Sequence, residues 1–154
     1  MTNLVIGAKL PSIEVAKEGQ ISEKNKYVPW SSSEVVGEPK VLIVMAGHPE
    51  SGDKVADLLA KLDAEKPEAR VVKIVNTKEA PMGAGMFIKS EFKKAYKANP
   101  ANTLVLDKNA TAKEALAIAD LSALVAVLNA DGEAVFVHEG HCGAAEIDAV
   151  LAAL

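Results

Sequence analysis

The chain has little of several residue types on which particular protein chemistries depend. It contains one cysteine, so no disulfide can form within it and its stability does not depend on oxidation. It also has a single arginine, Arg70, and aromatic residues make up only 4% of the sequence. Arginine dominates the recognition of phosphate and guanine, and aromatic anchors dominate protein-binding hot spots. We therefore expect no nucleic-acid partner and a core built from aliphatic side chains.

Long hydrophobic runs are also absent. No segment approaches the roughly 20 apolar residues that a membrane-spanning helix requires. The first seven residues, MTNLVIG, lack the basic start and the long apolar stretch of a secretory signal peptide. The net charge is −4 and the isoelectric point is near 5.4. The sequence predicts a protein with no membrane span.

The length of 154 residues fits one domain with a single core. We expect that domain to cover residues 1–154, with an N-terminal extension at 1–39 and a core at 40–154. From residue 40 onward, strand and helix patterns alternate. The predicted strands are 41–45, 70–75, 103–106, 121–128 and 133–138, and the predicted helices are 51–62, 81–97, 111–120 and 142–154.

The extension at 1–39 is divided by glycine and proline into short apolar pieces. Residues 11–16 are predicted to pair with residues 20–21 as a small hairpin. The segment 31–36 ends at Gly37 and predicts one helical turn with a serine cap, an irregular loop being the alternative.

Cap residues are predicted for two of the helices of the core. Ser51 or Asp53 can cap the helix 51–62, and Thr111 with Glu114 matches a capping box for the helix 111–120. The helix 81–97 is expected to face inward with its apolar residues: Met86, Phe87, Phe92, Ala95 and Tyr96.

The order of these elements predicts the fold class. A strand–helix–strand crossover gives parallel strands, because such crossovers are right-handed in nearly all proteins. The Asp-Gly pair at 131–132 predicts an antiparallel hairpin before the last helix. Together they indicate an α/β domain of the thioredoxin-like type, a three-layer sandwich with a mixed central sheet flanked by helices. A flavodoxin-like sheet is the rival, and the hairpin argues against it.

Two blocks of sequence resemble a known family. The segments 74–77 (IVNT) and 81–90 (PMGAGMFIKS) resemble a block typical of the YtfJ family, and the similarity extends over nearly the whole chain. The family consists of bacterial proteins of unknown function with a thioredoxin-like fold, usually exported to the periplasm. The resemblance implies a periplasmic location, whereas the lack of a signal peptide in this sequence leaves a cytoplasmic relative as the alternative.

Thioredoxin-type disulfide exchange needs a thiolate at a helix start, where amide donors and the helix dipole stabilise negative charge. The corresponding segment here, 48–51, reads HPES and contains no cysteine. The second requirement is a cis-proline before the hairpin strand, and Ser122 stands there with no proline beside it. The sequence therefore argues against a two-cysteine disulfide oxidoreductase and against a peroxiredoxin.

The leading functional hypothesis is a non-catalytic binding or accessory protein with an unknown protein or small-molecule partner and no cofactor. Ligands of such sheets bind beyond the carboxyl ends of parallel strands. The candidate ligand-binding residues there are His48, Glu50, Ser51, Asn76, Thr77, Gly83 and Gly85. Gly83 and Gly85 resemble a phosphate-cradling turn, but the pattern lacks a third glycine, and close approach of a helix to the sheet is the preferred explanation. His48 and Glu50 as an acid/base pair form a further alternative.

A different hypothesis concerns the segment around the only cysteine. His138, His141 and Cys142 offer two imidazoles and a thiolate, which suit Zn²⁺ or copper in a redox- or metal-responsive protein. Cys142 alone, near a predicted helix start, can have a lowered pKa and be reactive. The alternative is a small buried residue in a strand-to-helix connection.

Overall fold

The chain folds into seven strands and four α-helices, and the computed structural model describes residues 1–154. The strands are β1 Glu14–Ile21, β2 Tyr27–Ser31, β3 Lys40–Ala46, β4 Arg70–Asn76, β5 Thr103–Asp107, β6 Ala123–Leu128 and β7 Ala134–Glu139. The helices are α1 Pro49–Glu65, α2 Gly85–Ala98, α3 Thr111–Ala115 and α4 Ala144–Ala153, with short 3₁₀ turns η1 Glu23–Asn25 and η2 Ser32–Val35. None of the helices combines the length and the hydrophobicity needed to cross a bilayer.

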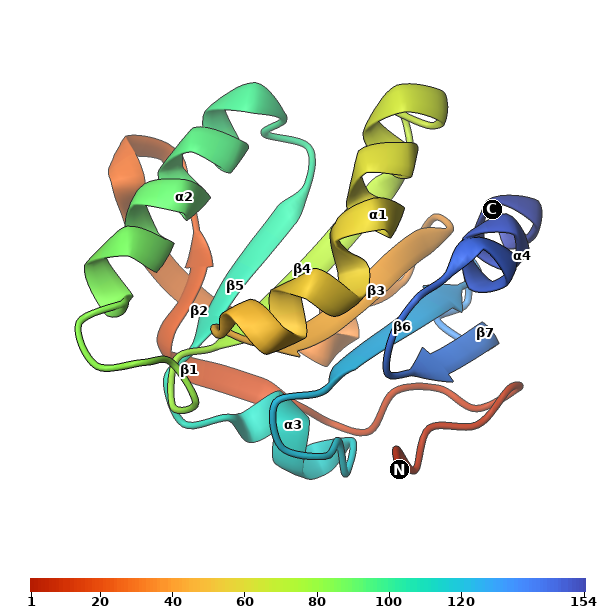
Figure 1. Cartoon of the computed structure of the whole chain (residues 1–154), viewed down its shortest axis with the longest axis horizontal. Helices are drawn as coiled ribbons and strands as arrows, with labels where there is room; N and C mark the ends of the chain where they lie inside the picture. The colour runs from red at the N-terminus through yellow and green to blue at the C-terminus, as the bar shows by residue number, and fades with distance from the viewer.

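All seven strands form one mixed sheet in the order β2-β1-β5-β4-β3-β6-β7 (Figure 1). Strands β3, β4 and β5 are parallel, and the pairs β3–β6 and β6–β7 are antiparallel. The predicted parallel crossover and Asp-Gly hairpin are both present, so the prediction of a mixed sheet is confirmed.

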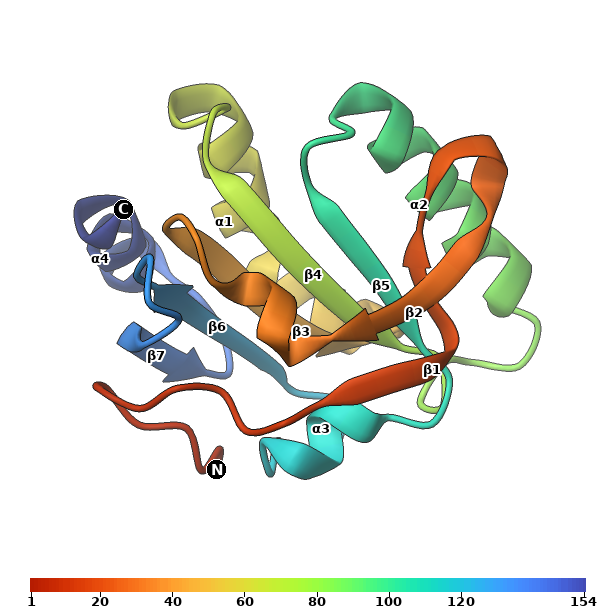
Figure 2. The same cartoon turned by 180° about the vertical axis from the view of Figure 1, so that it is seen from behind.

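Two apolar clusters cover the two faces of the sheet. Helices α1, α2 and α4 lie over one face, and α3, η2 and the N-terminal segment lie over the other (Figures 1 and 2). Strand β3 shows how the sequence supplies both clusters, since Ile43 and Met45 face the helices while Leu42 and Val44 face the opposite side. A continuous apolar run is what a strand buried on both faces requires.

The N-terminal hairpin differs from the prediction. Residues 11–16 do not pair with residues 20–21, because the parts of both segments that form a strand belong to the single strand β1. The partner of β1 is β2, which the sequence pattern did not identify, and β1 also pairs with the edge of β5. The hairpin prediction was wrong in its pairing, since the glycine at position 19 lies in a bulge of β1 rather than in a turn.

Helix starts also depart from the sequence pattern. The capping box at Thr111 does not form; Ala110 is the N-cap of α3, and Asp107 Oδ2 accepts from the Ala112 N–H at 2.8 Å. Helix α3 is short because Ala117 adopts a left-handed conformation two residues after its end. The prediction for η2 is confirmed, with Ser31 as its N-cap.

The apolar face of α2 is narrower than predicted. Phe92 is buried, whereas Met86 and Phe87 are 85% and 67% exposed. Ala95 is exposed as well, so the predicted inward positions Met86, Phe87 and Ala95 were wrong. In the first turn of α2, Ile88 packs against the core, whereas Met86 and Phe87 are exposed.

Candidate functional site

The carboxyl ends of β3 and β4 meet the start of α1, where ligands of parallel sheets usually bind. His48 is the N-cap of α1, and its Nδ1 accepts from the Glu50 backbone N–H at 3.1 Å. Pro49 occupies the first helical position, which it favours because it has no N–H to satisfy. The predicted caps Ser51 and Asp53 were wrong, since the helix starts two residues earlier than its apolar periodicity indicates.

Ser51 instead forms a buried clasp beneath this helix start. Its hydroxyl accepts from the Ala46 N–H at 3.0 Å and donates to the Ser122 carbonyl at 2.6 Å. The side chain is completely buried. Ser51 therefore joins the end of β3, the first turn of α1 and the residue before β6. In a two-cysteine oxidoreductase this helix start carries the reactive thiols; here it carries an imidazole cap and a fully hydrogen-bonded hydroxyl.

A second clasp fixes the loops beside the first. Asn76 Nδ2 donates to Glu79 Oε1 at 2.9 Å, and Asn76 Oδ1 accepts from the Glu79 N–H at 2.9 Å. Glu79 Oε2 accepts from the Leu121 N–H at 2.9 Å and so holds Leu121, whose φ is +55°. Because Asn76 is buried and both of its amide atoms are used in this way, its role in the structure is to position loops.

The remaining candidates at this end of the sheet are less constrained. The Thr77 N–H donates to the Asp107 carbonyl at 3.2 Å, which ties the loop after β4 to β5. Glu50 is exposed, and no hydrogen bond joins its carboxylate to His48, whose Nδ1 already serves as the cap. The two side chains therefore do not form the predicted acid/base pair.

Gly83 lies in the exposed turn before α2, and Gly85 is the first residue of that helix. A side-chain Cβ added at either position would meet no atom within 4 Å, so neither glycine permits a close approach of helix and sheet. Gly47 does this instead, because a Cβ there would lie 2.7 Å from Ile88 Cδ1. Gly47, which the sequence pattern did not single out, is the residue that lets α2 pack beside the end of β3.

A largely apolar cleft of about 400 Å³ opens beside the start of α1, over β4 and along α2. It is large enough to hold a small molecule, since ligand sites of proteins typically measure about 300–1,000 Å³. Four of the residues that line it come from the helix start and the loop before α2: His48, Pro49, Pro81 and Ala84. The outer wall is formed by α2 through Phe87, Ile88 and Phe92, and the floor includes Lys73 and Val75 of β4.

Lys73 is the residue of this cleft that the sequence analysis missed. The signal was present, because a lysine interrupts the apolar run 71–75 in the middle of a buried strand. Burial lowers the pKa of Lys73, and the carboxylate of Glu91 partly offsets that effect.

The structure does not assemble the metal site proposed at the other end of the chain. His138 Nε2 lies 2.7 Å from the His141 carbonyl oxygen, so the first imidazole is engaged with the backbone. Cys142 is completely buried while His141 is exposed, and no group of three His, Cys, Asp or Glu side chains is arranged to hold an ion. The three residues are neighbours in sequence but do not converge in space.

Cys142 also differs from the expected reactive thiol. It precedes α4 rather than opening it, and its N–H donates to the Lys54 carbonyl at 2.8 Å. Burial, together with the nearby carboxylate of Glu146, raises the pKa of the Cys142 thiol to about 11. A raised pKa disfavours the nucleophilic thiolate, so this cysteine is a core residue.

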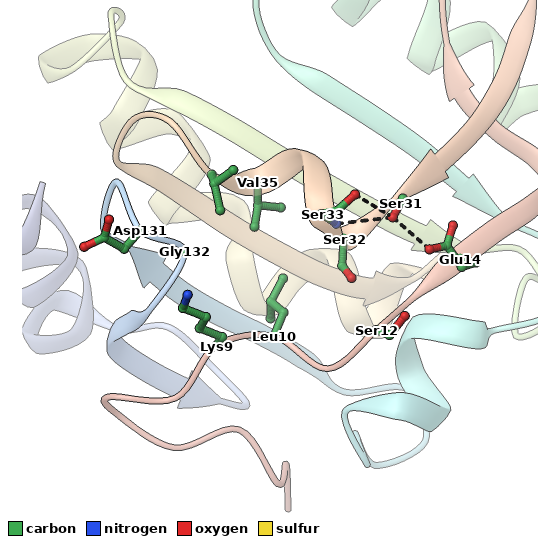
Figure 3. Close-up of a pocket in the computed structure, with 11 residues that line it drawn as sticks. Lys9, Leu10, Ser12, Glu14, Ser31, Ser32, Ser33, Val35, Asp131 and Gly132 are labelled. Atoms are coloured by element: carbon green, nitrogen blue, oxygen red, sulfur yellow. Dashed lines mark hydrogen bonds between the residues drawn. The ribbon is translucent and has the colours of Figure 1, made fainter.

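A second hollow, of about 330 Å³, lies beside η2 and the N-terminal segment and is lined by serines (Figure 3). Ser31 Oγ donates to Glu14 Oε1 at 2.8 Å and lies 3.0 Å from Ser33 Oγ. Ser32 Oγ accepts from the Ile13 N–H at 2.9 Å and donates to the Pro11 carbonyl at 3.0 Å. These hydroxyls fix η2 against the start of β1.

Comparison of the sequence with protein families gives a match over residues 4–154 to a family described as "Bacterial protein of unknown function (YtfJ_HI0045)". The chain belongs to this family. Two relatives of the YtfJ family are 29% identical to it: an uncharacterized protein of Haemophilus influenzae, matched over 97% of this chain and 84% of the relative, and the uncharacterized protein YtfJ of Escherichia coli K12, matched over 94% and 82%. The resemblance seen in the sequence is confirmed.

Solved structures similar to this YtfJ-family chain include thiol-disulfide oxidoreductases. The thioredoxin domain of an oxidoreductase from Bacteroides vulgatus matches with a TM-score of 0.61 and 15% identity, over 97% of this chain and 98% of that one. A secreted disulfide oxidoreductase of Mycobacterium tuberculosis matches with a TM-score of 0.57 and 20% identity, over 83% and 90%. At such identities the likeness shows the thioredoxin-like fold alone, which is the predicted fold class.

Proposed function

We propose that this chain is a non-catalytic binding or accessory protein that uses a thioredoxin-like fold to hold a ligand in the cleft between α1 and α2. The observation that carries the proposal is the position of the cleft. It opens at the helix start where oxidoreductases of this fold hold their thiols, and its walls are mostly apolar. The fold's usual binding position is thus kept, while the residues that would perform exchange are replaced.

The residues at the helix start support a binding role rather than turnover. Ser51 is completely buried, and its hydroxyl already donates and accepts within the chain, so it is not presented to a substrate. The Nδ1 of His48 is engaged as a helix cap. His48 and Glu91 also line the cleft and are polar residues from which a ligand can take further contacts.

For the partner, we propose only a chemical class. An apolar cleft of this size suits a small molecule or a protruding side chain of another protein, and the scarcity of arginine argues against nucleic acid. A periplasmic location, as the family resemblance implies, is part of the same proposal.

Binding of a neutral apolar dye tests the cleft. Nile red fluorescence should rise on addition of the protein, and Ala95→Trp, which places an indole in the cleft wall, should abolish that rise. Ala98→Trp is the matched control, because Ala98 ends the same helix outside the cleft and should leave dye binding unchanged. Equal dye binding by both variants would contradict the assigned site.

Catalysis is tested separately. The purified protein should show no turnover in insulin reduction or in a thiol-dependent peroxidase assay, because Cys142, its only thiol, is buried. Turnover in either assay would overturn the non-catalytic proposal.

A further inference from the structure

Lys73 occupies an unusual position at the floor of the cleft. It lies in the middle of β4, with Ile43 of β3 and Leu104 of β5 as its neighbours in register. Both neighbours belong to the apolar cluster under α1 and α2, so the lysine emerges on the face of the sheet that these helices cover. Its side chain is mostly buried and lines the cleft.

The ammonium group of Lys73 has no partner within the chain. Six salt bridges occur in the structure, and none involves Lys73. The nearest acidic influence is Glu91 of α2, whose side chain is half exposed at the cleft rim and lies 3.6 Å from Lys94 Nζ. A cation removed from water without a counterion is costly, so proteins normally pair such a group.

We propose that the cleft binds an apolar molecule that carries one carboxylate, a medium-chain fatty acid, with the carboxylate paired to Lys73 and the chain packed against α2. The inference rests on the proposed binding function and names its ligand class. The chain of the ligand would extend from Lys73 past Ile88 and Phe87 toward Pro81.

The charge of the lining selects a singly charged headgroup. Lys73 is the only lysine or arginine among the lining residues, and the carboxylate of Glu91 also lines the cleft, which disfavours a multiply charged anion. A phosphate group normally needs several such donors, whereas one ammonium suffices for a carboxylate.

The apolar surface around the cleft suits an alkyl chain. Phe87 both lines the cleft and is largely exposed, and the neighbouring Met82 and Met86 are exposed as well. Methionine side chains adapt to irregular apolar ligands because they are unbranched and flexible. An alkyl chain that extends beyond the cleft would therefore continue over an apolar surface.

Displacement of Nile red by decanoate and by decanol tests the inference. The affinity for decanoate should be at least roughly tenfold higher than that for decanol, because only the acid pairs with the Lys73 ammonium. Across octanoate, decanoate and dodecanoate the affinity should rise by about fourfold per buried methylene until the cleft is filled.

Three variants distinguish the contribution of the Lys73 charge to binding from that of the apolar cavity. Lys73→Met should remove the preference for decanoate and leave decanol binding unchanged, and Lys73→Arg should restore most of the preference. Lys94→Met is the matched control, because Lys94 is an exposed lysine of α2 outside the cleft, and it should bind decanoate like the unchanged protein.

Two results would overturn the inference, and they differ in what else they overturn. If the dye binds but decanoate binds no more tightly than decanol, or if Lys73→Met keeps the preference, the ligand class is wrong and the proposed binding cleft stands. If neither the dye nor decanoate binds in the cleft, the proposed function fails together with the inference.

Discussion

The serine-lined hollow and the α1–α2 cleft are similar in size but differ in whether their polar groups have partners within the chain. In the hollow, Ser31 and Ser32 each bond to other groups of the chain, so the polar surface is used to hold η2 in place. In the cleft, Lys73 forms no salt bridge, and most of the residues that line the cleft with it are apolar, Glu91 being the one carboxylate among them. Hydrogen-bonded hydroxyls such as those of Ser31 and Ser32 stabilise the fold. An unpaired charge such as that of Lys73 can instead gain free energy by pairing with a ligand of opposite charge.

The hydrogen bonds of Ser51 extend the comparison to the buried residues beneath the start of α1. There the polar groups are again fully used within the chain, even though the position is the reactive one in oxidoreductases of this fold. The Ser51 hydroxyl is buried and hydrogen-bonded within the chain, whereas Lys73, on the floor of the cleft, forms no salt bridge.

The largest expected effect is at this clasp. Ser51→Ala should destabilise the protein by about 3 kcal/mol, because the Ala46 N–H and the Ser122 carbonyl each lose a buried partner. Urea denaturation measures the change. Ser90→Ala, at an exposed serine of α2, is the control and should stay within about 0.5 kcal/mol. A loss below about 1 kcal/mol at Ser51 would show that water or local shifts replace the clasp.

Cys142 provides the next test, on the same face of the sheet as the cleft. Its pKa rises from the ordinary 9.0 to about 11 in the folded protein, so the folded state holds the proton more tightly than the unfolded state. The resulting stability is fully present below pH 9 and is lost as the pH rises toward 11, by about 3 kcal/mol in total.

The measurement compares the free energies of unfolding at pH 9 and pH 11 for the protein and for Cys142→Ala. The variant should lose less stability than the unchanged protein over this interval, since it has no thiol to ionise. Equal losses would mean that the thiol ionises as easily in the folded state as in the unfolded one.

The serine-lined hollow should respond to Ser32→Ala with a loss of about 2 kcal/mol, because the buried Ile13 N–H is left without an acceptor. Ser33→Ala is the matched control from the same turn. Its hydroxyl contacts only Ser31 Oγ at an exposed position, so a change within about 0.5 kcal/mol is expected. Equal losses of stability in the two variants, measured by thermal or urea unfolding, would show that the buried hydrogen bonds of Ser32 contribute no more than the exposed contact of Ser33.

The smallest effect has the opposite sign. Lys73→Met should stabilise the protein at pH 7 by about 1 kcal/mol, since it removes an unpaired, desolvated charge from the cleft. Because the Lys73 pKa is lowered in the folded state, the unchanged protein gains stability as the pH rises from that lowered value toward 10.5. The advantage of the variant should therefore shrink over the same interval.

Lys94→Met is the control for this measurement, and its effect on the free energy of unfolding should be close to zero at every pH. If Lys73→Met destabilises the protein at pH 7, the Lys73 ammonium has a stabilising partner, and the contrast between the two hollows is lost.

Much of the architecture could be predicted because it depends on local patterns. The apolar runs at 41–45 and 70–75 can be buried only as strands covered on both faces, and the Asp-Gly pair fixes the last hairpin. The lack of cysteine at 48–51 excludes two-cysteine exchange on residue type alone, since no arrangement of the chain can supply the missing thiols.

Other features depended on which segments the fold brings together. Asp107 caps α3 from the end of β5, and β1 finds its partner in β2 instead of within its own segment. A hydrogen bond between residues distant in sequence leaves no periodic signal, so neither could be predicted from spacing.

The sequence by itself determined the strand and helix alternation, the family and the absence of a reactive cysteine pair, because each of these is a property of residue type and order. Only the tertiary structure decided that Ser51 is bonded within the chain and that Cys142 is buried away from the histidines. It also placed Lys73 without a partner on the floor of an apolar cleft. The reason is physical: burial and hydrogen-bond satisfaction depend on the atoms that surround a group, and most of those atoms come from elsewhere in the chain.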